Sequence, residues 1–222
     1  MIKKFTIYGE RCSGTNYLEQ LILKNFDVEI TWEYGWKHWM GFNNDEYDNS
    51  DDCLFIGIIR HPLKWLESLY KHKHHLKDEF TKNKKRFLYS EVHSYDFKKN
   101  NIEIKEDYDL NNKKKPYKNI ISLRNTKNIF LIKEMPNLVK NYIIIRYEDL
   151  TINFNKIMNN FIKKGLKKKE NINFPLNVND HYIGGKINNE KNNNKRKFFK
   201  SDLISHPQFN LFLENKLLGY KI

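Results

Sequence analysis

Two glycines near the N-terminus, Gly9 and Gly14, have the spacing of a loop that wraps around a phosphate group. Backbone N–H groups at Cys12–Asn16 can point at one anion, and the dipole of a following helix adds to the attraction. Nucleotide triphosphatases place a lysine and a hydroxyl residue after the second glycine, whereas this chain has Thr15 and Asn16. The loop either binds a phosphate without that lysine or is a plain turn between a strand and a helix.

A second group of polar residues follows the apolar run Cys53–Arg60. Arg60 ends the run, Pro62 comes two residues later, and Ser68 comes eight residues after the arginine. Proline favours the first turn of a helix, and Ser68 would then lie about two turns along it. A guanidinium and a hydroxyl placed in this way can bind a second phosphate beside the first. The alternative is an arginine paired with a carboxylate and a serine that faces solvent.

The hydrophobic pattern predicts an α/β fold that positions both groups. The expected strands are Lys3–Tyr8, Trp32–Lys37, Cys53–Arg60 and Asn141–Leu150. The expected helices are Thr15–Phe26, one that begins at Pro62, Ile152–Leu166 and His206–Tyr220, the last packed by Phe209, Phe212, Leu213 and Leu217. Strands that alternate with helices predict three layers, with a mostly parallel central sheet flanked by helices. Ligands of such sheets bind at the carboxyl ends of the strands, so the glycine loop and Arg60 can share one site.

Two polar stretches interrupt this pattern. Residues 77–118 are lysine-rich and weakly periodic, which predicts an inserted, loop-rich segment with short helices. Residues 167–200 are polar and basic, and we expect them to be mobile. The histidines at 72, 74 and 75 suit a solvated helix face better than a metal site. The chain as a whole, 1–222, is expected to form a single domain.

The composition predicts a folded protein with a basic surface. The 222 residues are 39% hydrophobic, and the formal net charge is +13. This charge favours anionic partners, but it equally describes a solvated surface in a chain rich in Lys and Asn, a bias typical of AT-rich genomes such as those of some viruses. Two cysteines make no disulfide framework, and no zinc-ligand spacing is present. Without a signal-peptide core or a long apolar run, we expect a soluble, intracellular (cytoplasmic) protein with no membrane span.

Together, the two motifs resemble those of the sulfotransferases that use 3'-phosphoadenosine 5'-phosphosulfate (PAPS). That family binds the 5'-phosphosulfate with Lys-Ser-Gly-Thr-Thr/Ser and an aromatic residue, and Cys12–Tyr17 reads Cys-Ser-Gly-Thr-Asn-Tyr. Its 3'-phosphate motif is Arg-x-Pro with a serine and an aromatic residue further on. The matching residues are Arg60, Pro62, Ser68 and Tyr70. The family also commonly has the sequences found here at Arg146–Leu150 and Leu218–Tyr220.

The resemblance implies a P-loop NTPase-like sulfotransferase fold and a metal-independent enzyme. Such an enzyme moves a sulfuryl group from PAPS to an acceptor hydroxyl, on a glycan or a small molecule, and releases adenosine 3',5'-bisphosphate. The implied 5'-phosphosulfate site consists of Arg11, Cys12, Ser13, Gly14, Thr15, Asn16 and Tyr17. Arg60 and Ser68 are the implied 3'-phosphate site. Backbone amides and hydroxyls hold the phosphosulfate in this family, so the missing lysine of the triphosphatases is not needed.

One departure from the family affects the chemistry. The family lysine before Ser-Gly, which stabilises charge on the oxygen between phosphorus and sulfur, is Cys12 here. Arg11 or Lys37 is expected to supply that charge, and a cysteine beside Arg11 at a helix start is expected to have a lowered pKa. A base must also accept the proton of the acceptor hydroxyl. His38 is the predicted base because imidazole titrates near neutral pH, and Glu33 is the carboxylate alternative.

Two other functions remain open at this stage. A P-loop kinase for nucleosides would require a lysine at Thr15 and an acidic residue that binds magnesium. A degenerate sulfotransferase-fold protein that binds polyanions is compatible with Cys12 and with the net charge of +13. No motif for RNA or DNA is readable, so nucleic acid is not the expected partner. Residues 77–118 are where acceptor specificity is expected to reside.

Overall fold

A computed structural model of the chain describes residues 1–38, 47–72, 74–178, 182–183, 186–187 and 200–222. Its centre is a four-stranded sheet in the order β2-β1-β3-β6, and every neighbouring pair is parallel. The four strands are β1 (Lys4–Tyr8), β2 (Glu29–Ile30), β3 (Cys53–Ile59) and β6 (Tyr142–Arg146). This confirms the predicted α/β class with a parallel sheet flanked by helices.

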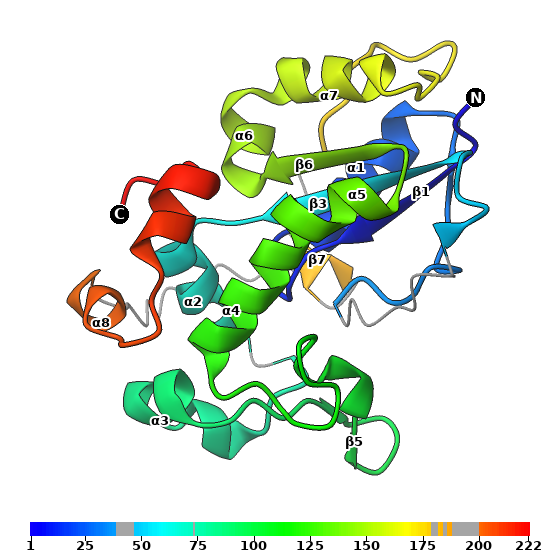
Figure 1. The fold of residues 1–222 in the computed structure, drawn as a ribbon. Helices are drawn as coiled ribbons and strands as arrows, with labels where there is room; N and C mark the ends of the chain where they lie inside the picture. The colour runs from blue at the N-terminus through cyan, green and yellow to red at the C-terminus, as the bar shows by residue number, and fades with distance from the viewer. Residues whose placement is uncertain (39–46, 73, 179–181, 184–185, 188–199) are drawn as a thin grey trace.

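Helices lie on both faces of this sheet (Figure 1). The α-helices of the described residues are α1 (Thr15–Asn25), α2 (Pro62–Lys71), α3 (Lys84–Tyr89), α4 (Ile120–Ile129), α5 (Met135–Leu138), α6 (Tyr147–Ile152), α7 (Phe154–Lys163) and α8 (Lys200–Ile204), of which α3 and α8 lie away from the sheet. Alternate residues of β3 serve the two faces, as the period of a strand requires. Leu54, Ile56 and Ile58 pack with α1 and α7, whereas Phe55 and Ile59 pack with α5 and the residues before it. All seven residues of β3 are buried, which explains its nearly continuous apolar sequence.

The predicted strand at Trp32–Lys37 is wrong. The strand in this region is β2, which ends at Ile30, and the chain then turns. Gly35 has a φ of 96°, and its N–H donates to Trp32 O at 3.1 Å, which closes a turn. The aromatic residues that favoured a strand instead pack as a cluster, with the Tyr34 ring tilted against that of Phe55 in the core.

Two further boundaries differ from the prediction. The strand expected to reach Leu150 ends at Arg146, and Tyr147 begins α6, whose first turn holds the acidic residues that favour a helix N-terminus. At the C-terminus the expected helix is a short π-helical turn over Leu213–Leu217. Its wider period changes which side chains face the core. Leu213 is buried, but Phe212 and Leu217 are 64% and 42% exposed.

The inserted segment, 77–118, packs against the rest of the protein. It contains 3₁₀ turns at Asp78–Thr81 and Lys105–Asp107, helix α3, and an antiparallel hairpin of β4 (Tyr95–Asp96) and β5 (Ile102–Glu103). Its buried side chains join Trp65, Leu66 and Leu69 of α2 in a separate hydrophobic cluster. These side chains are Phe80, Phe87, Leu88, Val92 and Tyr117. The segment is thereby held against the protein, and it supplies two buried polar side chains to the region beneath the glycine loop, described below.

The basic stretch 167–200 is described only in part. Lys169 N donates to Asn25 O at 2.9 Å, and Val178 is buried, so the beginning of the stretch packs beside the end of α1. Strands β7 (Tyr182–Ile183) and β8 (Lys186–Ile187) form a short antiparallel pair. The rest of the predicted mobile segment lies outside the described residues. No helix in the described part of the chain is both long enough and apolar enough to cross a membrane.

Candidate functional site

The strand order places the two predicted phosphate motifs side by side. The chain leaves β1 towards β2 on one side and leaves β3 towards β6 on the other. The carboxyl ends of β1 and β3 therefore form the point of the sheet at which ligands of α/β proteins bind. The glycine loop follows β1, and Arg60 follows β3. Arg60 Nη1 donates a hydrogen bond to Cys12 O at 2.9 Å, which joins the two motifs directly.

The glycines of the loop are required by close contacts. Gly14 has a φ of 95°, and a Cβ there would lie 2.3 Å from the Tyr147 ring. A Cβ at Gly9 would lie 2.6 Å from Ile58 Cγ2. Among the described residues, no side chain caps α1 and no acidic residue lies in its first turn. The N–H groups at the start of α1 are therefore not satisfied by a side-chain cap, and a helix start of this kind attracts anions.

The two residues predicted for the 3'-phosphate both contact Cys12. Ser68, on α2, lies close enough to the Cys12 thiol to lower its pKa, and Arg60 donates to the Cys12 carbonyl. The Arg60 guanidinium also lies over the ring of Tyr147, with 4.7 Å to the ring centroid. The loop, the end of β3 and the middle of α2 thus converge on one residue.

The prediction of a low pKa at Cys12 is wrong. Burial raises the pKa of its thiol to about 11, and the effects of Ser68, Arg60 and Arg11 do not reverse this. A thiol with this pKa is protonated at neutral pH and is a poor nucleophile. Cys12 is therefore a structural part of the loop, where it adopts a left-handed conformation with a φ of 65°.

Lys37 lies at the entrance of α1. Its Nζ donates to Asn16 Oδ1 at 2.5 Å and to Glu19 Oε2 at 3.2 Å. The ammonium group is 5.2 Å from the ring centroids of Trp32 and of Trp36, and the residue is 6% exposed. A chain segment outside the loop therefore brings a cation to the first turn of α1, where an anion bound by the loop would sit.

Arg11 has a different environment from the one predicted. Its Nε donates to Glu10 Oε1 at 2.7 Å, its Nη1 to Ser94 Oγ at 2.6 Å, and its Nη2 to Asp107 Oδ2 at 2.9 Å. The residue is 2% exposed. Its guanidinium is engaged within the protein interior, so of the two cations predicted to stabilise charge on the ligand, the structure brings only Lys37 to the start of α1.

His38 lies against the beginning of the loop as a neutral imidazole. Its Nδ1 is 2.8 Å from Gly9 O, a geometry in which Nδ1–H donates and Nε2 carries the lone pair. Burial lowers the pKa of His38 to about 3, with Arg11 and Lys37 acting in the same direction, so the expectation that this imidazole titrates near neutral pH is wrong. The backbone of this segment is attached to the loop as well, because Gly9 N donates to Lys37 O at 3.1 Å.

Glu33 does not belong to the site. Its carboxylate pairs with Lys4 Nζ at 3.0 Å, at the amino end of β1, whereas the glycine loop leaves the carboxyl end. The pair is also largely exposed. The prediction of Glu33 as an alternative base is therefore wrong, because Glu33 lies at the opposite end of β1 from the loop. His38 is the remaining candidate.

The neutral state of His38 predicts a pH dependence of stability. The folded-state pKa is about 3 and the ordinary value is 6.5. Between these pH values the unfolded chain binds a proton at His38 that the folded protein does not bind. His38 therefore leaves the free energy of unfolding unchanged above pH 6.5 and lowers it progressively as the pH falls below 6.5. We expect the free energy of unfolding to decrease from pH 6.5 to 5, with His38 contributing up to about 1.4 kcal/mol per pH unit. Urea unfolding across this range measures it.

His38→Asn is the control for this measurement. The asparagine amide can still donate to Gly9 O, but it does not titrate. His74, whose pKa burial lowers to about 4, acts in the same direction in both proteins and cancels in the comparison. Equal slopes in the two proteins would contradict a neutral His38 in the folded protein.

The remaining predicted residues of the loop, Ser13, Thr15 and Tyr17, are held by burial or by contacts with other segments. Ser13 and Thr15 are buried. Tyr17 donates its hydroxyl hydrogen to Asn177 Oδ1 at 2.8 Å and packs edge-on against Tyr147, 6.1 Å between ring centroids. The aromatic residue of the loop is thus held by a segment far along the sequence.

Several residues of the site were missed by the sequence analysis. Ser94 and Asp107 come from the polar insert, where no pattern distinguishes them from their neighbours. Lys127 gave a usable signal, because it continues the buried stripe of α4 seven residues after Ile120 and four after Leu123. A lysine at such a position indicates a buried charge with partners.

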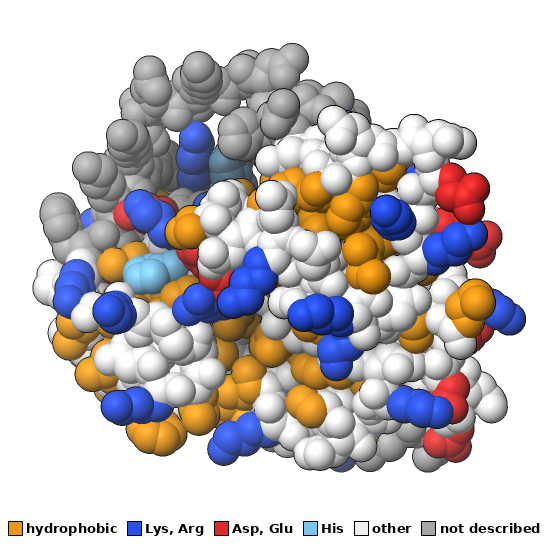
Figure 2. All heavy atoms as spheres, turned by 90° about the horizontal axis from the view of Figure 1, so that it is seen from above, with side chains coloured by type: hydrophobic (Ala, Val, Ile, Leu, Met, Phe, Trp, Pro, Cys, Tyr) orange, Lys and Arg blue, Asp and Glu red, His pale blue; other side chains and the backbone are white. Residues whose placement is uncertain are grey.

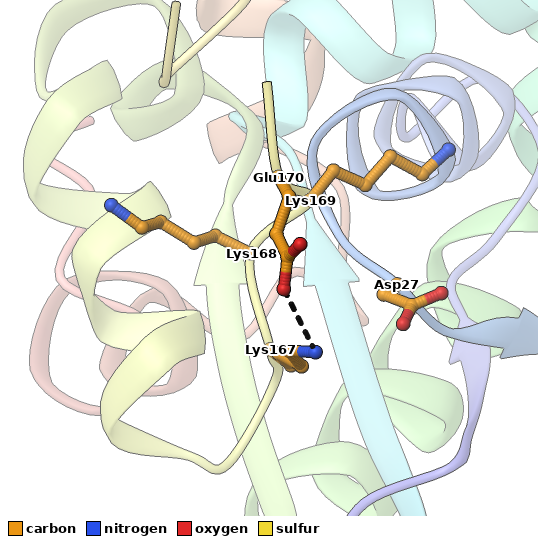
Figure 3. Close-up of a pocket in the computed structure, with 5 residues that line it drawn as sticks. All are labelled: Asp27, Lys167, Lys168, Lys169 and Glu170. Carbon is orange, nitrogen blue, oxygen red and sulfur yellow. Dashed lines mark ion pairs between the residues drawn. The ribbon is translucent and has the colours of Figure 1, made fainter. Parts of the chain in front are cut away.

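A surface hollow elsewhere does not contribute to this site. It has a volume of about 380 Å³ and is lined by Asp27 and residues 167–170, beyond the C-terminal end of α1, whereas the loop lies at its N-terminal end. Figure 3 shows Lys167 paired with Glu170, while Lys168 and Lys169 extend in opposite directions. The basic side chains do not converge on a common point.

No protein-family model, curated protein or solved structure matches the chain. The function of the site must therefore be inferred from its own geometry and chemistry.

Proposed function

We propose that the protein is a PAPS-dependent sulfotransferase with a P-loop NTPase-like fold. The observation that carries this proposal is the meeting of both phosphate motifs at Cys12, through Arg60 and Ser68. A nucleotide with phosphates at both its 3' and 5' positions needs two adjacent anion sites. The helix start beyond Gly14 offers one of them, and the Arg60–Ser68 pair offers the other.

The residues of the site fit a transfer of a sulfuryl group to an acceptor hydroxyl. The acceptor oxygen bonds to sulfur, its proton passes to His38 Nε2, and the bond from sulfur to the bridging oxygen breaks. Negative charge then develops on the bridging oxygen, which leaves as part of adenosine 3',5'-bisphosphate. Lys37 is the cation at the start of α1 that stabilises this charge. No step requires a metal ion.

The acceptor is a hydroxyl group on a glycan or a small molecule. Residues 77–118 are the segment that we assign to its recognition, because this segment lies against the loop through the Ser94 contact with Arg11. Segments inserted beside a fixed site are where related folds vary their specificity.

A polyanion-binding function receives less support. Figure 2 shows Lys and Arg side chains spread over the visible face and separated by uncharged and hydrophobic side chains. A protein that binds polyanions requires basic residues gathered along a groove or stripe. A kinase function also lacks its lysine, since Thr15 occupies that position.

Calorimetric titration with adenosine 3',5'-bisphosphate tests the proposal. We expect micromolar binding to the unmodified protein and weaker binding by roughly 30–100-fold in Arg60→Ala, because a charge-assisted interaction is lost. Ser68→Ala should weaken binding by about 5-fold, since only a hydroxyl donor is removed.

Lys64→Ala is the matched control. Lys64 lies on α2, as Ser68 does, but its side chain pairs with Glu67 at the surface. It should bind the bisphosphate as the unmodified protein does. If the protein bound ATP with magnesium but not the bisphosphate, a kinase function would replace the proposed sulfotransferase function. Absence of binding to both would leave a degenerate fold.

A further inference from the structure

Four buried charged side chains beneath the loop form a closed ring. Glu10 Oε1 binds Arg11 Nε at 2.7 Å, and Arg11 Nη2 binds Asp107 Oδ2 at 2.9 Å. Asp107 Oδ1 binds Lys127 Nζ at 2.6 Å, and Lys127 Nζ returns to Glu10 Oε2 at 2.6 Å. Each carboxylate uses one oxygen for each cation, so the ring is closed and electrically neutral.

The ring is isolated from water. Its four side chains are 1–5% exposed. Ser94 adds a further contact, since its hydroxyl hydrogen-bonds both Arg11 and Asp107. Burial alone would raise the pKa of Glu10, but Arg11 and Lys127 outweigh it and hold this pKa below its usual range. The carboxylate is therefore ionised, and the ring consists of charges.

Stability alone is a poor explanation for such a ring. Buried ion pairs are often no more stabilising than well-packed apolar side chains of the same volume, whereas they do fix relative positions. The ring joins three parts of the chain that are distant in sequence. These parts are the glycine loop, the insert at 77–118 and helix α4.

The ring also reaches the candidate base. The third acceptor of Lys127 Nζ is His38 O, at 2.5 Å. The His38 ring in turn donates from Nδ1 to Gly9 O. Lys127 therefore contacts both His38, through its carbonyl, and the loop, through the Glu10 carboxylate. On the loop side, Glu10 and Arg11 immediately precede Cys12, whose left-handed conformation is uncommon for a residue other than glycine.

We propose that Lys127 and Asp107 are positioning residues, whose ring with Glu10 and Arg11 sets the conformation of the phosphate-binding loop and the orientation of the His38 imidazole. The role as it bears on catalysis rests on the proposed function, but the positioning itself does not. Lys127 contacts neither predicted phosphate site directly and acts through Glu10 and through His38 O.

A charge-neutral double variant and a control variant in the core separate an effect on positioning from an effect on folding. Lys127→Met removes the ammonium group but leaves one net negative charge buried, so this variant can fail to fold. Lys127→Met combined with Asp107→Asn restores neutrality and leaves the Glu10–Arg11 pair. The control is Phe161→Leu, a core substitution on α7 that lowers stability without touching the ring. Each protein is measured at the same number of degrees below its own melting temperature, so that differences in stability do not affect the comparison.

The first measurement is the tautomer of His38, read by long-range ¹H–¹⁵N NMR at pH 7 without ligand. We expect the Nδ1–H form in the unmodified protein and in Phe161→Leu, and a mixture with the Nε2–H form in the double variant. The second is the affinity for adenosine 3',5'-bisphosphate, expected to fall about 10-fold in the double variant and less than 2-fold in the control.

The outcomes distinguish this inference from the proposed function. An unchanged tautomer in the double variant, or the same change in Phe161→Leu, would overturn the positioning role. Failure of the unmodified protein to bind the bisphosphate would overturn the proposed function, while the tautomer measurement would still decide the role of the ring. A changed tautomer with unchanged affinity would limit the role to His38 and refute the effect on the loop.

Discussion

Lys37→Met is expected to lower kcat for sulfuryl transfer by about 10²–10³-fold, the effect of removing one preorganised charge from a transition state. Methionine can keep the contact with the rings of Trp32 and Trp36 but lacks the charge and the hydrogen bonds to Asn16 and Glu19. The affinity for adenosine 3',5'-bisphosphate should change less than about 3-fold, because Arg60 and the loop remain. Labelled PAPS, with the best acceptor from a panel of sugars and phenols, provides the rates.

Lys24→Met is the matched control for this substitution. Lys24 lies in the last turn of α1, the helix whose first turn Lys37 contacts, and it donates to Asn177 O at the surface. Its loss removes an equal charge from the protein and should leave kcat within about 2-fold of the unmodified value, since a distant exposed charge is screened. Equal rates in Lys37→Met and Lys24→Met would contradict the assignment of Lys37 as the charge stabiliser.

His38→Asn is expected to lower kcat by about 10²–10⁴-fold, the usual contribution of a general base. Asparagine keeps a donor for Gly9 O and removes the lone pair at Nε2, so the loop should remain in place. Bisphosphate affinity therefore serves as the control and should be unchanged. Because the pKa of His38 is about 3, the imidazole is already neutral at pH values near 7.

The pH profile gives this assignment a second test. The ratio kcat/KM reports the free enzyme, so it should show no acidic limb near pH 6.5. A bound anion raises the pKa of a neighbouring histidine, so NMR titration should show the His38 pKa rising on addition of bisphosphate. An acidic limb at pH 6.5, or wild-type kcat in His38→Asn, would exclude His38 as the base.

The sequence predicted best where the signal is local. The strand β1, the glycine loop that follows it, and the proline at the start of α2 are each readable within a few residues. Periodicity located the buried strand β3 to within one residue of its end, and the rule for parallel sheets then placed Arg60 beside the loop.

The failures involve contacts between distant segments. Nothing near Arg11 in the sequence indicates that Asp107 and Ser94 will bind its guanidinium, so an arginine beside a phosphate loop was assigned to the phosphate. The cluster Trp32–Lys37 has the composition of a strand, but packing of its aromatic rings and the turn at Gly35 decide its structure. Glu33 was assigned to the site for the same reason, because its distance from the loop depends on that turn.

The pairing of β1 with β3 has a consequence for how a sample of this protein should be judged. Tyr8 lies opposite Gly57, so the loop after Tyr8 and the arginine after Ile59 leave the sheet with a fixed offset. A slip of one residue between these strands would displace Arg60 by about 3.3 Å along the strand and exchange the faces of the sheet. Refolded material with that slip would retain the circular dichroism of an α/β protein, but its two proposed anion sites would no longer face the same ligand. Ligand binding, and not secondary-structure content, is the appropriate measure of correctly folded protein.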